Sequence, residues 1–220
     1  DDRLLRLDAL TLKNYYHSKG FLDVKIEDSF TEIQISDKKY VNILFKINEG
    51  KQYYLSKVNI SGNVLINSER IKELLDLYLK KPYDPVGLND NLYLLENEYH
   101  ELGKLYFDVS IKDLISDSVL VDININEGNN YYLRNTSFEK TGNIDSSLVL
   151  RELKYKTGDL YSKSIMDKTS KHLREIGIFS TANLTPTKVA DSDSLVDIFI
   201  DLKRYKQREW NSSGGLVPIS

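Results

Sequence analysis

Two four-residue stretches decide the fold of this chain: Ile47-Asn48-Glu49-Gly50 and its recurrence as Ile125-Asn126-Glu127-Gly128, 78 positions later. Tyr53-Tyr54-Leu55 recurs at the same offset as Tyr131-Tyr132-Leu133. Similarity at a fixed spacing is the mark of a chain built from repeated structural units. We therefore interpret the sequence as tandem copies of one module of about 75 to 80 residues.

A helix that ends at a glycine is the second repeated feature. It is found as Tyr16-His17-Ser18-Lys19-Gly20-Phe21, as Tyr99-His100-Glu101-Leu102-Gly103 and, more loosely, around Gly177. Glycine suits the left-handed position at which a helix stops. Two apolar stripes at helical spacing precede these ends: Leu92, Leu95, Tyr99 and Leu102, and then Met166, Thr169, Leu173 and Ile176.

The rest of the module is predicted from the middle copy. Lys57-Val58-Asn59-Ile60 indicates a strand that ends at a Ser61-Gly62-Asn63 turn. Asn67 or Ser68 is expected to cap a helix, whose apolar stripe is Ile71, Leu74, Leu75 and Tyr78. Alternating residues at 108–112 and 119–126 predict two strands joined by a turn. The module is therefore strand, helix, helix, strand, strand, which is an α+β unit.

The repeat divides the chain into three modules and a tail. Residues 51–128 and 129–203 each form a complete module, and residues 1–50 hold only a second helix and two last strands. The residues that mark this first part are Leu5, Ala9, Leu12 and Tyr16 for the helix, Val24 with Ile26 for one strand, and 40–47 for the other. Because it begins in mid-repeat, we expect the chain to be a piece of a larger protein.

This order of elements resembles the POTRA domains of the BamA- and TamA-like outer-membrane protein assembly superfamily. The resemblance is carried by Val58-Asn59-Ile60-Ser61-Gly62-Asn63, by Tyr15-Tyr16-His17-Ser18-Lys19-Gly20-Phe21 and by the two Ile-Asn-Glu-Gly stretches, and it spans residues 1–203. It implies tandem POTRA modules, each a three-stranded mixed sheet with two helices on one face. It also implies a location on the periplasmic face of the Gram-negative outer membrane.

The same resemblance implies a non-catalytic arm that binds unfolded outer-membrane proteins, or other extended peptides, and accessory assembly subunits. A C-terminal barrel outside this chain would hold the arm in the membrane, and residues 204–220, with Trp210, would be a linker and the start of the first barrel strand. A plain linker or a cloning remnant is the other interpretation of that tail. Two alternative functions are a two-partner-secretion-type transporter with one exported substrate and a structural interaction module.

Composition excludes several other classes of function. The net charge of −3 gives no basic surface for nucleic acid, and the absence of cysteine excludes thiolate metal sites. His17 and His100 occupy equivalent positions and are interpreted as surface residues at helix ends. No arrangement typical of catalysis, cofactor binding or metal binding is found in the sequence, so we expect no enzyme and no cofactor.

The candidate binding site is the strand after each second helix, which the resemblance places at a sheet edge. An edge strand presents unpaired N–H and C=O groups to which an extended client can add. The residues expected there are Asp108, Val109, Ser110, Ile111 and Lys112 in the middle module, Asp23, Val24, Lys25 and Ile26, followed by Glu27, in the first, and Thr181, Ala182, Asn183 and Leu184 in the third.

Three points stay open at this stage. Alternating charges along these strands either accompany client binding or only protect the edge against aggregation. Phe107 and Phe179 either line a groove beside the edge strand or anchor it in the core. The pairs Tyr53-Tyr54 and Tyr131-Tyr132 either wedge neighbouring modules or simply open the next strand.

Overall fold

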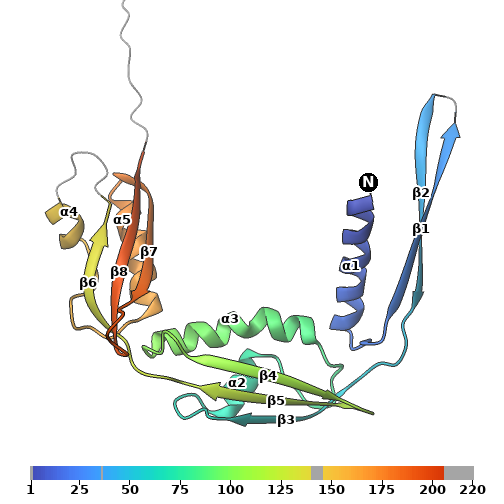
Figure 1. The fold of residues 1–220 in the computed structure, drawn as a ribbon, viewed down its shortest axis with the longest axis horizontal. Coiled ribbons are helices and arrows are strands. Elements are labelled where there is room, and N and C mark those ends of the chain that lie inside the picture. Colours follow the sequence, from blue (N-terminus) through green and yellow to red (C-terminus); the bar gives the residue numbers. More distant parts are fainter. Residues whose placement is uncertain (1, 36, 140–145, 206–220) are drawn as a thin grey trace, which may run out of the picture. The chain divides into compact units, whose positions relative to one another are not determined.

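The computed structural model describes residues 2–35, 37–139 and 146–205, in two compact units, Asp1–Asn129 and Asn130–Ser220 (Figure 1). Of the predicted linker and barrel-strand start at 204–220, residues 206–220 lie outside the described residues, as does Gly142-Asn143, the counterpart of Gly62-Asn63 in the repeat. None of the helices in the described ranges is long and apolar enough to cross a membrane.

The first unit begins with one helix and a two-stranded sheet. Helix α1 (Asp2–Ser18) ends before Gly20, which takes the positive φ of 84° predicted for a helix stop. Strands β1 (Lys25–Ile35) and β2 (Lys38–Asn48) form an antiparallel pair in which Phe30 lies opposite Ile43. The last two strands of the incomplete first copy are thus present, and they are longer than the alternation in the sequence indicated.

The second part of this unit has the predicted order of strand, helix, helix, strand, strand. It consists of β3 (Leu55–Ser61), α2 (Ser68–Leu74), α3 (Pro85–Glu101), β4 (Asp108–Ile115) and β5 (Val119–Asn126). The sheet order is β3-β5-β4, with β3 parallel and β4 antiparallel to β5. This mixed three-stranded sheet confirms the predicted fold class, and the last strand in sequence lies at its centre.

Capping and alternation explain these elements. The side chain of Asn67 accepts a hydrogen bond of 2.8 Å from the amide of Arg70, as predicted for the start of α2. Every second residue of β5, from Val119 to Ile125, is buried against the side chains of α2 and α3. The two helices therefore cover one face of the sheet. Tyr78 was wrongly assigned to the stripe of α2: the helix ends at Leu74 and Tyr78 is exposed.

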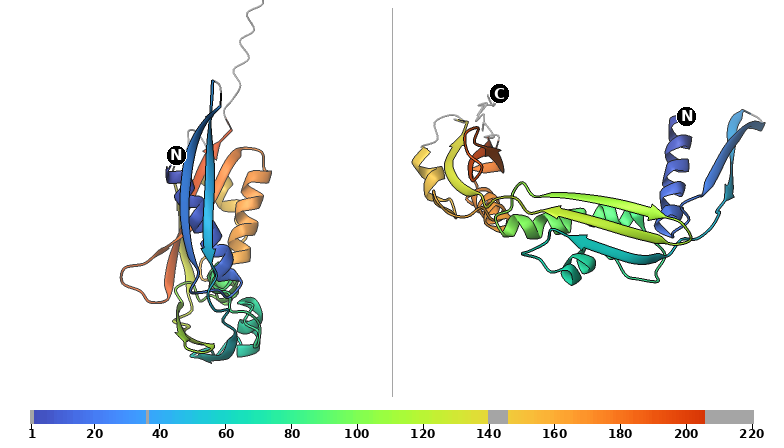
Figure 2. Two further views of the ribbon diagram at one scale, coloured as in Figure 1. Left: turned by 90° about the vertical axis from the view of Figure 1, so that its right-hand side faces the viewer. Right: turned by 60° about the horizontal axis from the view of Figure 1, so that its bottom comes forward.

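The second unit repeats this architecture. It consists of β6 (Tyr132–Phe138), α4 (Ser146–Arg151), α5 (Lys163–Glu175), β7 (Phe179–Lys188) and β8 (Leu195–Arg204), with the sheet order β6-β8-β7. Alternate residues of β8 from Val196 to Leu202 are buried, and α5 packs along β7 (Figures 1 and 2). The Asp191-Ser192-Asp193-Ser194 stretch lies in the β7–β8 connection rather than in a metal-binding loop.

Candidate functional site

The predicted edge residues fall on the outermost strands in both complete modules. Residues 108–112 lie within β4 and residues 181–184 within β7, and each strand pairs on one side only. In the first copy the prediction is partly wrong, because β1 begins at Lys25. Asp23 and Val24 belong to the preceding turn, where Val24 is buried and the carboxylate of Asp23 accepts a hydrogen bond from the Tyr53 hydroxyl.

The hydrogen-bonding direction of β4 follows from the strands beside it. The amide of Val119, in β5, donates at 2.9 Å to the carbonyl of Tyr54, next to β3. Odd-numbered residues of β5 therefore turn toward β3, and even-numbered residues turn toward β4. The register pairs odd-numbered residues of β4 with odd-numbered residues of β5. The backbone groups that point away from the sheet are consequently those of Val109, Ile111, Asp113 and Ile115.

A groove of about 310 Å³ lies between this edge and α3. Its lining residues are Tyr83, Pro85, Leu88, Asn89, Leu92, Val109, Ile111 and Asp113. Hydrocarbon side chains, such as Leu88 and Leu92, share the walls with polar groups, among them the amide of Asn89 and the carboxylate of Asp113. The outward-facing residues of β4 thus border the groove, so a strand added to β4 would place every second side chain beside α3.

The two phenylalanines are anchors of the core rather than groove residues. Phe107 stacks on Tyr99 with ring centroids 4.7 Å apart, and Phe179 is almost completely buried. This outcome selects one of the two interpretations left open by the sequence. The helix residues that do line the groove, Leu88 and Leu92, carry the periodic signal of any amphipathic helix, and nothing in the sequence distinguished them.

One polar pair lies inside the groove. The hydroxyl of Tyr83 is buried and has no hydrogen bond of ordinary geometry among the described residues. Its burial and the nearby carboxylate of Asp113 raise the pKa of Tyr83 above its ordinary value. Tyr83 is therefore protonated at neutral pH, and no ammonium or guanidinium group of the described chain is paired with Asp113.

The histidines differ from the surface residues that were predicted. The Nε2 atom of His100 lies 3.1 Å from the carbonyl of Leu105, which ties the end of α3 to the following turn. In the first copy the Nε2 atom of His17 is buried, and burial lowers the pKa of that histidine. Within the described ranges, no group of three His, Cys, Asp or Glu side chains is placed to hold a metal ion.

Tyr53 joins the incomplete first copy to the middle module. Its amide donates to the carbonyl of Gly20 at 2.8 Å, and its hydroxyl donates to Asp23 Oδ2 at 2.6 Å. The side-chain amide of Gln52 donates to the carbonyl of Lys19 at 2.9 Å. At this junction the first tyrosine of the pair therefore holds neighbouring modules together as well as leading into β3.

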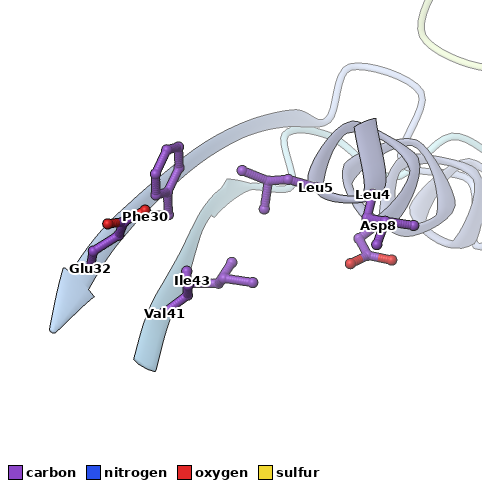
Figure 3. A pocket seen from close by; sticks show the side chains of 7 residues that line it. All are labelled: Leu4, Leu5, Asp8, Phe30, Glu32, Val41 and Ile43. Carbon is purple, nitrogen blue, oxygen red and sulfur yellow. The ribbon is translucent and has the colours of Figure 1, made fainter. Parts of the chain in front are cut away.

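A second groove lies between α1 and the β1–β2 hairpin, with a volume of about 370 Å³. Figure 3 shows its seven lining residues: Leu4, Leu5 and Asp8 from α1, Phe30 and Glu32 from β1, and Val41 and Ile43 from β2. Val41 is 58% exposed, whereas Val119, at the matching repeat position in the middle module, is fully buried. In the middle module β3 pairs along the edge of β5, and the side chains of α2 and α3 pack on this face.

Comparison with known proteins agrees with this architecture. Residues 53–128 match the family model described as POTRA, surface antigen variable number repeat. A putative outer membrane protein assembly factor of Treponema pallidum is 23% identical over 92% of this chain and 25% of its own length. The outer membrane protein assembly factor BamA of Buchnera aphidicola is 27% identical over 88% of this chain and 34% of its own length. This chain thus spans about a quarter to a third of these relatives.

Solved structures show the same fold. The crystal structure of Haemophilus influenzae BamA POTRA3-5 superimposes with a TM-score of 0.69, at 21% sequence identity. The match covers 91% of this chain and 80% of that one.

Proposed function

We propose, from the premise that this chain is built of POTRA domains of the BamA superfamily, that it is part of the periplasmic arm of an outer-membrane protein assembly factor. The arm would bind clients without catalysis and would contact accessory assembly subunits. What supports this proposal is the repeat of one sheet-and-helix module together with relatives whose names describe outer-membrane protein assembly.

The finer proposal is that unfolded outer-membrane proteins bind as extended strands at the module edges. The observation that carries it is the outer edge of β4, where alternate residues turn their N–H and C=O groups outward beside a groove that Leu88 and Leu92 help to line. Backbone pairing is tolerant of side-chain sequence. Such an edge therefore suits a receptor whose clients share alternating strands rather than one sequence motif.

Residues 1–50 are, in this proposal, the second half of another module. Support comes from the apolar face of the β1–β2 hairpin, which is exposed where the two complete modules cover the matching positions with a strand and a helix. The hydrogen bond between the Tyr53 hydroxyl and Asp23 would join this half-module to the middle module.

Titration with client peptides tests the proposal. The ¹⁵N-labelled chain would be mixed with synthetic peptides of about ten residues that copy membrane-barrel strands. Amides of β1, β4 or β7 are expected to shift and to gain protection from hydrogen exchange. Shifts confined to the helices would contradict client capture through edge strands. So would a failure of every peptide with alternating apolar residues to bind. A helical peptide of the same composition is the control.

A further inference from the structure

The two complete modules differ at the edge that the proposed function uses. In the second unit, the amide of Tyr132 donates to the carbonyl of Ser194 at 2.8 Å, on the β6 side of β8. Even-numbered residues of β8 therefore turn toward β6, and odd-numbered ones turn toward β7. The register pairs even-numbered residues of β7 with even-numbered residues of β8. The outward groups of β7 thus include those of Ala182, Leu184 and Pro186.

One of these outward groups is already occupied. The hydroxyl of Ser170, on α5, donates to the carbonyl of Ala182 at 2.6 Å. The guanidinium of Arg174, one helical turn further on, donates to the same hydroxyl oxygen at 2.8 Å. The serine is therefore held in place with its proton directed at the strand, and an incoming strand would meet its side chain, with the guanidinium of Arg174 on it, at the carbonyl of Ala182.

A second outward group is missing altogether. Pro186 has no N–H, so β7 lacks the donor that an added strand would need at this position. Proline on an exposed edge is a recognised way to prevent strand addition. Of three successive outward positions on β7, one carbonyl is occupied and one amide is absent, which leaves Leu184 alone between them.

The middle module has neither feature. Aligning Tyr99 with Leu173 in the repeat places Glu96 at the position of Ser170. A carboxylate has no proton to donate at neutral pH. Aligning the central strands places Asp113 at the position of Pro186, and Asp113 keeps its N–H. Among the described residues, no side chain donates to the outward carbonyls of β4.

We propose that the middle module is the strand-accepting one, and that Ser170 and Pro186 close the matching edge of the third module. This inference rests on the proposed function, since it assigns client binding to one of its candidate edges. The occupant of β4 is an extended peptide that pairs with Val109, Ile111 and Asp113. β7 is left to structural roles within its own module.

The groove beside β4 indicates the chemistry of the peptide. Alternate side chains would lie against Leu88 and Leu92, so they should be apolar. At one end of the groove they would meet the buried hydroxyl of Tyr83 and the carboxylate of Asp113, which forms no ion pair among the described residues. A lysine or arginine at the position that reaches Asp113 would complement that charge. The preferred ligand is therefore an alternating apolar strand that carries one basic residue.

Matched variants at the two edges test the inference. The probe is a synthetic peptide of alternating leucine and serine, in one form with a lysine and in one form without. With the wild-type chain, amide shifts are expected at Val109, Ile111 and Asp113 and not at Leu184. D113P should weaken binding of the neutral peptide by about five-fold or more, because one main-chain hydrogen bond is lost. D113N keeps the amide and should bind that peptide as the wild type does.

The reverse exchange opens the third module. Replacing both closing residues, as S170A with P186D, should give new peptide-dependent shifts at Leu184. Thermal unfolding of each variant checks that its fold is kept. Pro186 shows that the repeated fold tolerates a proline at the position that D113P changes in the middle module. Wild-type shifts on β7 as large as those on β4, or equal binding by D113P and D113N, would overturn the inference while client capture at edges stands. If no edge responds in any variant, the proposed function itself fails.

Discussion

The hydroxyl of Tyr99, on α3, donates a 3.1 Å hydrogen bond to the carboxylate of Glu127, directly after β5. The same carboxylate oxygen accepts hydrogen bonds from the amides of Val64 and Leu65, at 2.7 and 2.8 Å. One acidic side chain thus ties the second helix to the loop after the first strand. The glutamate of the repeated Asn-Glu-Gly motif is therefore a structural clamp that closes the middle module.

Removing this clamp is expected to destabilise the middle module. E127A leaves two backbone amides and the hydroxyl of Tyr99 without their acceptor, and the free energy of unfolding should fall by about 2 kcal/mol. Native-state hydrogen exchange of the amides in β5 measures this loss. D117A is the control, because the pair between Asp117 and Lys51 is exposed and contributes little. Equal losses in the two variants would contradict the clamp.

The clamp also predicts a pH dependence. Partial burial opposes the charged form of Glu127, but the hydrogen bonds from Leu65 and Val64 are among the causes that outweigh it. The pKa of Glu127 therefore lies below its ordinary value of 4.5. Because the folded pKa is the lower one, this stabilisation is complete above pH 4.5 and is lost as the pH falls through the folded value.

The glutamine variant isolates that contribution. E127Q keeps an acceptor oxygen but cannot ionise, so its stability deficit relative to the wild type should shrink steadily below pH 4.5. Urea unfolding from pH 7 to pH 3 measures the difference between the two chains. A deficit that stays constant over this range would show that the charge of Glu127 does not matter.

Most elements could be predicted from the sequence. The helices and strands have hydrophobic residues at the spacing typical of each, and the motifs that mark them recur about 78 residues later. The errors lie where tertiary contacts decide. The sequence pattern predicts Asp23 as the start of an alternating strand, but its carboxylate accepts a hydrogen bond from the hydroxyl of Tyr53 in the next module. Tyr78 continues the apolar spacing of α2, yet the chain leaves the helix at Leu74.

The binding edge was predicted in outline and not in detail. The sequence indicates which strand lies outermost only through the family resemblance, and the direction of each backbone group depends on register. The role of Ser170 could not be foreseen, because a half-buried serine beside the apolar stripe of α5 gives no sign in the sequence of which carbonyl it will reach. Pro186 did carry a readable signal, since proline is tolerated in a sheet mainly at an edge.

The Tyr53–Asp23 bond is expected to couple the first copy to the middle module. Y53F and D23A should each lower the free energy of unfolding, and the double variant should show a coupling energy of about 1 kcal/mol between the two side chains. Y54F is a control at the adjacent position, because the hydroxyl of Tyr54 donates only to the exposed side chain of Gln52. Strictly additive losses in Y53F and D23A would argue against this coupling.

A glycine exchange tests the predicted turn after β3. Gly62 has a φ of 81°, and a Cβ added there would lie 1.9 Å from the carbonyl oxygen of Ile125. G62A must therefore push β3 away from β5 in addition to bearing the strain of a left-handed residue, and a loss of about 3 kcal/mol or more is expected. Gly158 has a similar φ of 90° with no atom within 4 Å of an added Cβ, so G158A should lose only about 1 kcal/mol. Urea unfolding of both variants separates the two causes. Similar losses in G62A and G158A would mean that backbone strain alone, and not the close approach to Ile125, fixes glycine at this turn.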